Sequence, residues 1–213
     1  MSLIKSVIFD MDGVLLDARE WHYESLNRAL ELFGETISRV EHETFFDGLP
    51  TKHKLKELSK MGRVNESLHS VISEMKQSFT QEMIIKECRP NFEHEFALSR
   101  LKNDGYSLAV ASNSITSTIR EMMVKAGLIE YLEFFVSNED VVNAKPDPEI
   151  YLQAIRRLEL NPEQCLILED NDHGYEAAIK SGAHVMRVKN PSCVVYENIK
   201  TEIGLIENLE SKI

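Results

Sequence analysis

The chain is poor in cysteine and lacks the usual metal-binding patterns of cysteine and histidine. Its three Cys residues are widely spaced and form no C-x-x-C pair, which argues against a zinc site and against a disulfide framework. Its seven His residues form no H-E-x-x-H motif, and we expect them at the surface. Cys165 opens an apolar run and is predicted to be a small buried residue.

Positive charge and long apolar runs are also scarce. The 24 Lys and Arg residues face 35 Asp and Glu, which gives a net charge of -11. Such a surface repels nucleic acid and anionic membranes, so a phosphate site must be a local positive exception. No run is long enough to span a bilayer, and residues 1–5 lack the regions of a signal peptide. We therefore expect a cytoplasmic monomer without nucleic acid or membrane partners.

One stretch near the N-terminus, residues 6–14, concentrates the chemistry and reads SVIFDMDGV. Its apolar run, with β-branched members, is typical of a parallel strand buried on both faces, and it stops at a carboxylate. Open α/β sheets bind ligands past the carboxyl ends of their strands. Gly13 permits a sharp turn, so Asp10 and Asp12 can present two carboxyl groups to one small space. Two such groups require a cation or a shared proton.

The D-x-D-G pattern has two simpler explanations. Asp and Gly are common in surface turns for conformational reasons alone. Calcium loops also contain this pattern, but they continue with oxygen ligands, whereas here Val14, Leu15 and Leu16 follow. The calcium interpretation is therefore unfavourable. Whether residues 10–13 are a functional site or only a surface turn depends on the rest of the chain.

Three further polar segments follow in order along the chain. They are Ser112-Asn113 after a strand-like run, Lys145-Pro146-Asp147-Pro148 before a helical pattern, and Glu169-Asp170 after a second strand-like run. With residues 10–14 they resemble the four ordered motifs of the haloacid dehalogenase (HAD) superfamily. Residues 174–183 are similar to the segment after the fourth motif in the subgroup (subfamily I) that contains β-phosphoglucomutase and many small-metabolite phosphatases.

The alternation of strand and helix patterns predicts an α/β fold: a doubly wound, Rossmann-like parallel sheet with right-handed crossovers. Predicted strands cover residues 7–9, 108–111, 134–136, 165–168 and 184–188, and predicted helices cover 116–126 and 147–158. Residues 194–213 suggest a short closing helix.

Between the first two motifs the pattern is helical only. Helices are predicted after Asp17 as far as Gly34, over 51–61 and over 65–86. The apolar face of the first carries Leu26, Leu30 and Phe33, and that of the third carries residues such as Val71. Helices without intervening strands indicate a separate small domain. The resemblance implies that it is a cap, which we place at 17–91, with the core at 1–16 and 92–213 and connections at 16–18 and 89–91.

The resemblance also implies a role for each motif residue. Asp10 is the nucleophile that forms an aspartyl phosphate, and Asp12 is the acid/base that protonates the leaving oxygen and later accepts a proton from water. Ser112 binds a phosphate oxygen, Asn113 supports its loop, and Lys145 neutralises charge on Asp10 and the phosphoryl group. Taken alone, Ser112-Asn113 could be a turn and Lys145 a solvated surface residue.

A divalent cation is required by the charges. A dianionic phosphate about 4 Å from one carboxylate is repelled by roughly 8 kcal/mol at an effective dielectric near 20. Hard oxygen ligands suit Mg²⁺. The resemblance implies that Mg²⁺ is held by the Asp10 carboxylate, the Asp12 backbone carbonyl and Asp170, with Glu169 assisting.

The predicted activity is a Mg²⁺-dependent phosphatase of small phosphorylated metabolites such as sugar phosphates. Asp12 favours phosphate ester chemistry over the dehalogenase branch. A β-phosphoglucomutase-like phosphomutase is the alternative: Asp17 and His22 match its cap entrance, but residues 48–52, GLPTK, depart from its G-x-S-R cap loop. His22, Lys52 and His53 are the candidate substrate-binding residues of the cap, and the last two could equally be ordinary surface residues at a helix start.

Non-enzymatic functions are less favoured. A phospho-accepting receiver module also carries acids and a Lys at strand ends, but it is much shorter and has no cap. A silent binding protein would not need every catalytic position.

Overall fold

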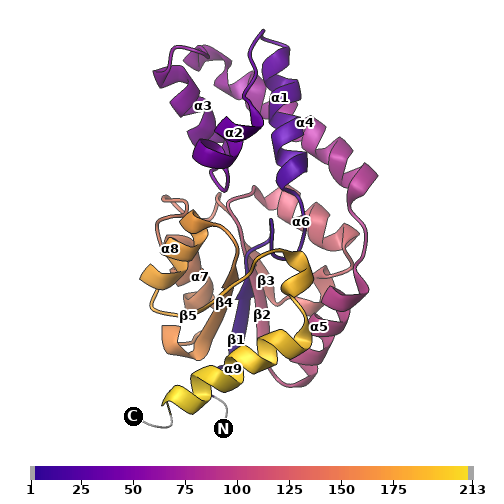
Figure 1. Cartoon of the computed structure of the whole chain (residues 1–213), viewed down its shortest axis with the longest axis vertical. Helices are drawn as coiled ribbons and strands as arrows, with labels where there is room; N and C mark the ends of the chain where they lie inside the picture. The colour runs from indigo at the N-terminus through magenta and orange to yellow at the C-terminus, as the bar shows by residue number, and fades with distance from the viewer. Residues whose placement is uncertain (1–2, 211–213) are drawn as a thin grey trace. The chain divides into compact units, whose positions relative to one another are not determined.

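The computed structural model describes residues 3–210 and divides into two units (Figure 1). One unit comprises the chain up to Asp17 and from Arg89 onward, and the other is Ala18–Cys88. The first boundary falls within the predicted connection 16–18, and the second directly precedes the connection 89–91. Among the described residues, no helix is both long and apolar enough to cross a bilayer.

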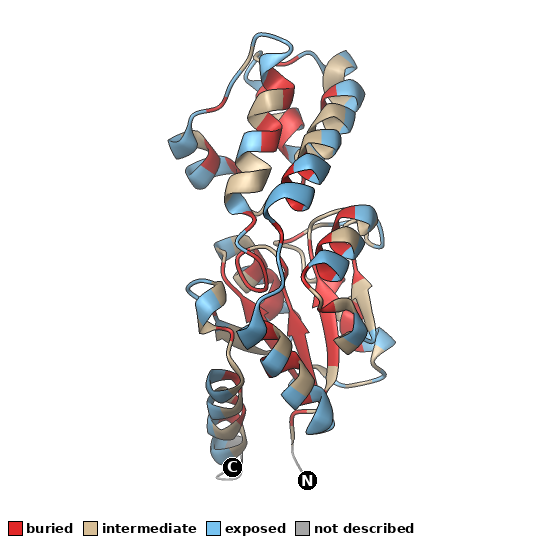
Figure 2. Ribbon diagram, turned by 90° about the vertical axis from the view of Figure 1, so that its right-hand side faces the viewer, coloured by how far each residue is buried: buried red, intermediate tan, exposed pale blue. Residues whose placement is uncertain are grey.

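The first unit is built on a five-stranded parallel sheet with the strand order β3-β2-β1-β4-β5. The strands are β1 (Ser6–Phe9), β2 (Ser107–Ala111), β3 (Phe134–Val136), β4 (Cys165–Glu169) and β5 (His184–Arg187). Every residue of β1 and β4 is buried. Strands coloured red in Figure 2 are buried ones, and tan segments mark strand residues of intermediate burial. Because successive strand residues point to opposite faces, both faces of the sheet must be covered.

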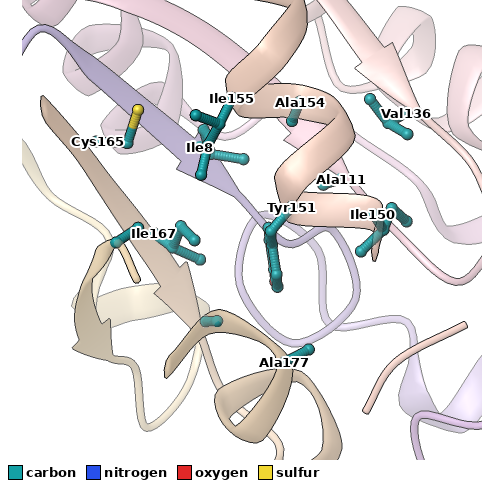
Figure 3. Packing of buried hydrophobic residues seen from close by; sticks show 12 residues of the cluster. Ile8, Ala111, Val136, Ile150, Tyr151, Ala154, Ile155, Cys165, Ile167 and Ala177 are labelled. Carbon is teal, nitrogen blue, oxygen red and sulfur yellow. The ribbon is translucent and has the colours of Figure 1, made fainter. Parts of the chain in front are cut away.

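Helices supply that cover. They are α5 (Phe92–Asn103), α6 (Thr116–Lys125), α7 (Glu149–Arg157), α8 (Asp172–Lys180) and α9 (Tyr196–Glu210), with short 3-10 turns η3 (Ile129–Tyr131), η4 (Pro162–Gln164) and η5 (Pro191–Cys193). On one face, α7 packs against β2 and β3 and α8 packs against β4 and β5, and the two helices form with the sheet a hydrophobic cluster that includes Ile8, Tyr151, Ile167 and Ala177 (Figure 3). The fold class predicted from the sequence is confirmed.

The elements of this unit for which a range was predicted match the structure within a few residues, except that the closing helix differs in length and that α5 and α8 had no predicted range. The closing helix, α9, is longer than expected and begins at Tyr196, while the part of the prediction over 211–213 lies outside the described residues. Helix α5 had no separate prediction; it begins at Asn91, whose side chain accepts a hydrogen bond from the backbone N–H of Glu93. Cys165 is fully buried, as predicted.

The second unit consists of helices only. They are α1 (Arg19–Glu31), α2 (Arg39–Glu41), the π-helix η1 (His42–Phe46), α3 (Thr51–Lys60), η2 (Glu66–Leu68) and α4 (His69–Glu87). Their buried residues form one hydrophobic cluster around Leu30, Phe46, Leu55 and Ile72. The unit therefore has a core of its own.

Several predictions of burial within the helices and for the histidines are wrong. Phe33 lies beyond the end of α1 and is 39% exposed. Val71 is 38% exposed, whereas Ile72, which the same apolar pattern also includes, is fully buried. The histidines are not all at the surface, since His42 and His94 are buried. Composition alone gave no sign that tertiary packing would enclose them.

Because His42 is buried, it makes the free energy of unfolding depend on pH. Burial, followed by the positive charges of Lys54 and His22, lowers the pKa of His42 to about 3, while Glu20 opposes the shift. Between pH 6.5 and 3 the unfolded chain therefore binds a proton that the folded chain does not, so the free energy of unfolding falls as the pH drops.

We expect His42→Phe to flatten this acid-side slope, which approaches ~1.4 kcal/mol per pH unit for a single group. The edge-to-face contact of His42 with Tyr23 can be kept by the phenyl ring. The measurement is the free energy of unfolding by urea between pH 4 and 7, with the exposed His53→Gln as the control. An unchanged slope in His42→Phe would contradict the assignment.

Candidate active site

The motif residues meet at one edge of the sheet. The register pairs Phe9 with Val110 of β2 and with Leu168 of β4, so the residues that follow, Asp10 and Glu169 among them, reach the same level. The backbone N–H of Asp10 still bonds the Leu168 carbonyl, at 3.0 Å. Because the chain crosses from β1 to one side for β2 and to the other side for β4, this edge is the switch point at which such sheets bind ligands.

Lys145 lies at the centre of the cluster. Its ammonium donates to Asp10 Oδ1 at 2.6 Å, to Glu169 Oε1 at 2.6 Å and to the carbonyl of Ala111 at 3.0 Å. A lysine ammonium has three donors, and all three are used. Lys145 is 3% exposed, so these bonds are shielded from water and fix the position of its charge.

Glu169 is held from several directions. Its Oε1 accepts from Lys145 and, at 2.6 Å, from the hydroxyl of Tyr151 on α7. Its Oε2 accepts from the backbone N–H groups of Asp170 at 3.0 Å and Asn171 at 3.4 Å. The carboxylate is fully buried and has protein donors on both oxygens.

The loop after β1 is turned tightly towards Asp170. The Met11 carbonyl accepts from the N–H groups of Leu15 and Leu16, and Gly13 adopts a φ of +87°. A Cβ at Gly13 would lie 2.0 Å from Asp170 Oδ2. Gly13 is therefore required both by its backbone conformation and by the close approach of the carboxylate.

The second motif is tied to the first and third. Asn113 Oδ1 accepts from the backbone N–H of Lys145 at 3.2 Å, which links the two loops. Ser112 is buried, and its hydroxyl oxygen accepts from the backbone N–H of Ser114 at 3.1 Å. The Ser114 hydroxyl in turn donates to Asp12 Oδ2 at 3.2 Å.

Three buried carboxylates could hold a metal ion. Asp10, Glu169 and Asp170 each offer an oxygen, and these three oxygens lie within 4.8 Å of one another. Against them stands the single ammonium of Lys145, which leaves an excess of two negative charges among these four groups. A divalent cation with hard oxygen ligands fits both the charge and the donor set.

The ionisation of the cluster follows from burial and charge. Burial raises the pKa of Asp10 well above its usual value, against the opposing pull of Lys145. Burial alone would lower the pKa of Lys145, but Asp10 and Glu169 hold it above its usual value, so the ammonium stays charged. Burial and the neighbouring Glu169 raise the pKa of Tyr151, which keeps its hydroxyl protonated as a donor.

The structure brings together the motif residues Asp10, Asp12, Ser112, Asn113, Lys145, Glu169 and Asp170. The other candidates, His22, Lys52 and His53, belong to the helical unit, where the last two are exposed near the start of α3 and His22 Nδ1 lies 3.2 Å from Lys76 Nζ. The sequence analysis did not identify Tyr151 or Ser114. Neither has a motif signal, although Ser114 follows Ser112 by two residues on the same loop.

This geometry agrees with the family comparison. Residues 7–188 match the model of the haloacid dehalogenase-like hydrolases, and the chain belongs to that family.

The relatives within the family include phosphatases. A phosphorylated carbohydrates phosphatase of Thermotoga maritima is 32% identical over 183 residues, covering 84% of this chain and 82% of that protein. The pyrophosphatase PpaX of Bacillus cereus is 25% identical over 195 residues, covering 84% and 82%. Among solved structures, β-phosphoglucomutase of Clostridium difficile has a TM-score of 0.83 at 21% identity, covering 95% of this chain and 98% of that one. That likeness shows the fold.

Gly13→Ala should disturb Asp170 as well as the backbone. Gly105 is a matched control because its φ is +90° and a Cβ there would meet nothing within 4 Å. We expect Gly105→Ala to cost ~1 kcal/mol of stability through its left-handed backbone. Gly13→Ala should cost ~1–3 kcal/mol more through overpacking.

The measurement is chemical denaturation of both variants together with calorimetric titration of Mg²⁺. Gly13→Ala should weaken Mg²⁺ binding, whereas Gly105→Ala should not. Equal effects of the two substitutions would show that the approach to Asp170 does not matter.

Proposed function

We propose that the chain is a Mg²⁺-dependent phosphatase that hydrolyses small phosphorylated metabolites, such as sugar phosphates, through an aspartyl phosphate on Asp10. The observation that carries the proposal is the buried ammonium of Lys145, 2.6 Å from Asp10 in a cluster with an excess of carboxylates. A fixed cation beside a nucleophilic carboxylate stabilises the charge of a transferring phosphoryl group. The family and its phosphatase relatives support the class of phosphoric monoester hydrolases.

In the first step, an Asp10 oxygen forms a bond to phosphorus while the bond from phosphorus to the ester oxygen breaks. Asp12 gives its proton to that leaving oxygen. In the second step, water attacks the aspartyl phosphate, Asp12 takes a proton from the water, and Asp10 and inorganic phosphate are released. The Ser114 hydroxyl donates to Asp12 Oδ2 at 3.2 Å and so helps to orient this acid.

The remaining motif residues bind and orient the phosphoryl group. Ser112 would donate to a phosphate oxygen, while Asn113 keeps its loop attached to Lys145. Asp10, the backbone carbonyl of Asp12 and Asp170 would hold Mg²⁺, with Glu169 assisting. When bound, the ion supplies the positive charge that offsets repulsion between the carboxylates and the phosphate.

The substrate class draws support from the relatives and from the helical unit. The Thermotoga relative is named for phosphorylated carbohydrates, and we propose a similar range here. We propose that Ala18–Cys88 acts as a cap, with His22, Lys52 and His53 contacting the substrate. The cytoplasmic location, the monomeric state and the absence of nucleic acid and membrane partners stay predictions from the sequence.

Asp10→Asn should abolish turnover while the fold is retained, because the amide keeps the size but cannot act as the nucleophile. Steady-state phosphate release and thermal unfolding measure the two effects. Asp104→Asn, at the end of α5 and outside the carboxylate cluster, is the control and should keep parental activity. Turnover by Asp10→Asn near the parental rate would refute the nucleophile assignment.

A screen of phosphorylated sugars, nucleotides and polyols tests the activity itself. We expect phosphate release with Mg²⁺, none with EDTA and poor recovery with Ca²⁺, because Ca²⁺ favours a larger and looser oxygen shell. Full activity in metal-free buffer would contradict the proposal.

The same screen separates a phosphatase from a phosphomutase. β-Glucose 1-phosphate is supplied with a trace of the 1,6-bisphosphate, and glucose 6-phosphate and inorganic phosphate are followed separately. A mutase must exclude water from its aspartyl phosphate. In residues 48–52 the cation, Lys52, stands one position later than the Arg of the G-x-S-R loop, and a lysine lacks the fork that could grip a second phosphate, so we expect hydrolysis to dominate. Rapid isomerisation with almost no released phosphate would favour the mutase instead.

A further inference from the structure

Tyr151 is a buried polar group that the mechanism above does not use. It is fully buried on α7, and its ring belongs to the hydrophobic cluster between α7, α8 and the sheet (Figure 3). A buried tyrosine hydroxyl needs an acceptor, and here the acceptor is the Glu169 carboxylate, at 2.6 Å. The ring also lies under the ammonium of Lys145, 4.7 Å from Nζ to the ring centroid. Tyr151 therefore contacts both members of one ion pair.

Gly174 lies against the same carboxylate, and it can lie so close only because it has no side chain. It lies in the first turn of α8, which begins where the Asn171 side chain accepts from the backbone N–H of Gly174 at 2.9 Å. A Cβ at this position would lie 1.7 Å from Glu169 Oε1 and 2.1 Å from Cδ. Any other residue would displace the carboxylate or the helix.

These contacts leave Glu169 a single position. One oxygen accepts from Lys145 and Tyr151, the other from two backbone N–H groups, and Gly174 closes the remaining side. We call Lys145, Tyr151, Glu169 and Gly174 the Glu169 clamp. Because Lys145 uses its three donors on Glu169, Asp10 and a backbone carbonyl, a shift of Glu169 must move the ammonium relative to Asp10.

We propose that Tyr151 and Gly174 are positioning residues: they fix the Glu169 carboxylate, which in turn holds the Lys145 ammonium against the nucleophile Asp10. The inference rests on the proposed phosphatase function, because the aligned step is attack of Asp10 on phosphorus. Neither residue touches the phosphoryl group. Groups that orient the active residues of a site in this indirect way typically change activity 10–100-fold when they are removed.

The first test is Tyr151→Phe, which removes the hydroxyl and keeps the ring under the ammonium. We expect kcat for the best substrate of the screen to fall about 10–100-fold while KM changes little, because the alignment acts on the transition state. Tyr106→Phe is the matched control. The Tyr106 hydroxyl accepts from Lys200 at 2.8 Å, and that ammonium lies 4.7 Å from its ring, away from the cluster. This control should keep parental kcat.

A double-mutant cycle separates positioning from a purely structural role. If Tyr151 acts through Glu169, the loss caused by Tyr151→Phe should largely disappear in a Glu169→Gln background. A hydroxyl that only stabilises the fold would lower the melting temperature and give the same fold-loss in both backgrounds. The folded fraction of each variant, taken from its unfolding curve, is used to correct kcat.

The second test is Gly174→Ala, with Gly204→Ala on α9 as its control. Both are helical glycines, but a Cβ at Gly204 would meet nothing within 4 Å. We expect Gly174→Ala to lose at least about tenfold in kcat and Gly204→Ala to keep parental activity. The ¹⁵N resonance of the buried Lys145 ammonium gives a readout that does not require turnover. It should shift in Tyr151→Phe and Gly174→Ala and stay in place in both controls.

Failure of the positioning role can be told apart from failure of the proposed phosphatase function. If the parent releases no phosphate from any substrate, the phosphatase proposal fails, whatever the variants do. If the parent is active and Tyr151→Phe keeps parental kcat, or its loss is undiminished in Glu169→Gln, the positioning role is refuted. An unmoved Lys145 resonance in Gly174→Ala would refute the role of Gly174.

Discussion

The bridge made by the Lys145 ammonium between Asp10 and Glu169 is the interaction on which the rest of the site depends. Two acids at the ends of adjacent strands would repel each other in a buried space, and one cation between them turns that repulsion into attraction. Removing the cation would leave two uncompensated buried carboxylates, which is far costlier than never burying the pair. A residue from a distant loop before α7 therefore offsets the charge gathered at the ends of β1 and β4.

The same bridge leaves negative charge in the site, because one ammonium faces three carboxylates. Lys145 offsets one of the three buried carboxylates, and the charge that remains is of the sign that a divalent cation would balance. Protein donors hold both oxygens of Glu169, whereas Asp10 and Asp170 complete the group of three carboxylates whose oxygens lie within 4.8 Å of one another. The lysine thus contacts two of the three carboxylates, and the contacts of Glu169 fix where its charge lies.

The sequence was sufficient for the charged residues and the fold class, and insufficient for the groups that orient them. Asp10 and Glu169 stand at strand ends, where a charge after an apolar run is conspicuous, whereas Lys145 was identified only by its place in the ordered motifs. Tyr151 occupies a core position of α7, and the helical pattern cannot distinguish a ring that only packs from one whose hydroxyl also reaches a carboxylate. Gly174 lies inside a helix, and its necessity appears only once the approach of α8 to Glu169 is known. Likewise, local sequence could not show that His42 would be enclosed, because its burial depends on contacts with other helices.

Tyr151 belongs both to the hydrophobic core and to the candidate active site. Its ring is fixed among residues such as Ile150 and Ala177, while its hydroxyl must stay 2.6 Å from Glu169 Oε1. Protein interiors are close-packed, so a change of volume between α7 and α8 is transmitted to the hydroxyl instead of being absorbed. Since a displacement of 1 Å in a reacting geometry can cost about 10²-fold in rate, apolar residues remote from phosphate act on the chemistry through this ring. If the chain has the proposed activity, stability and activity are therefore coupled on this face of the sheet, where one cluster contains both the packed side chains and the ring of Tyr151.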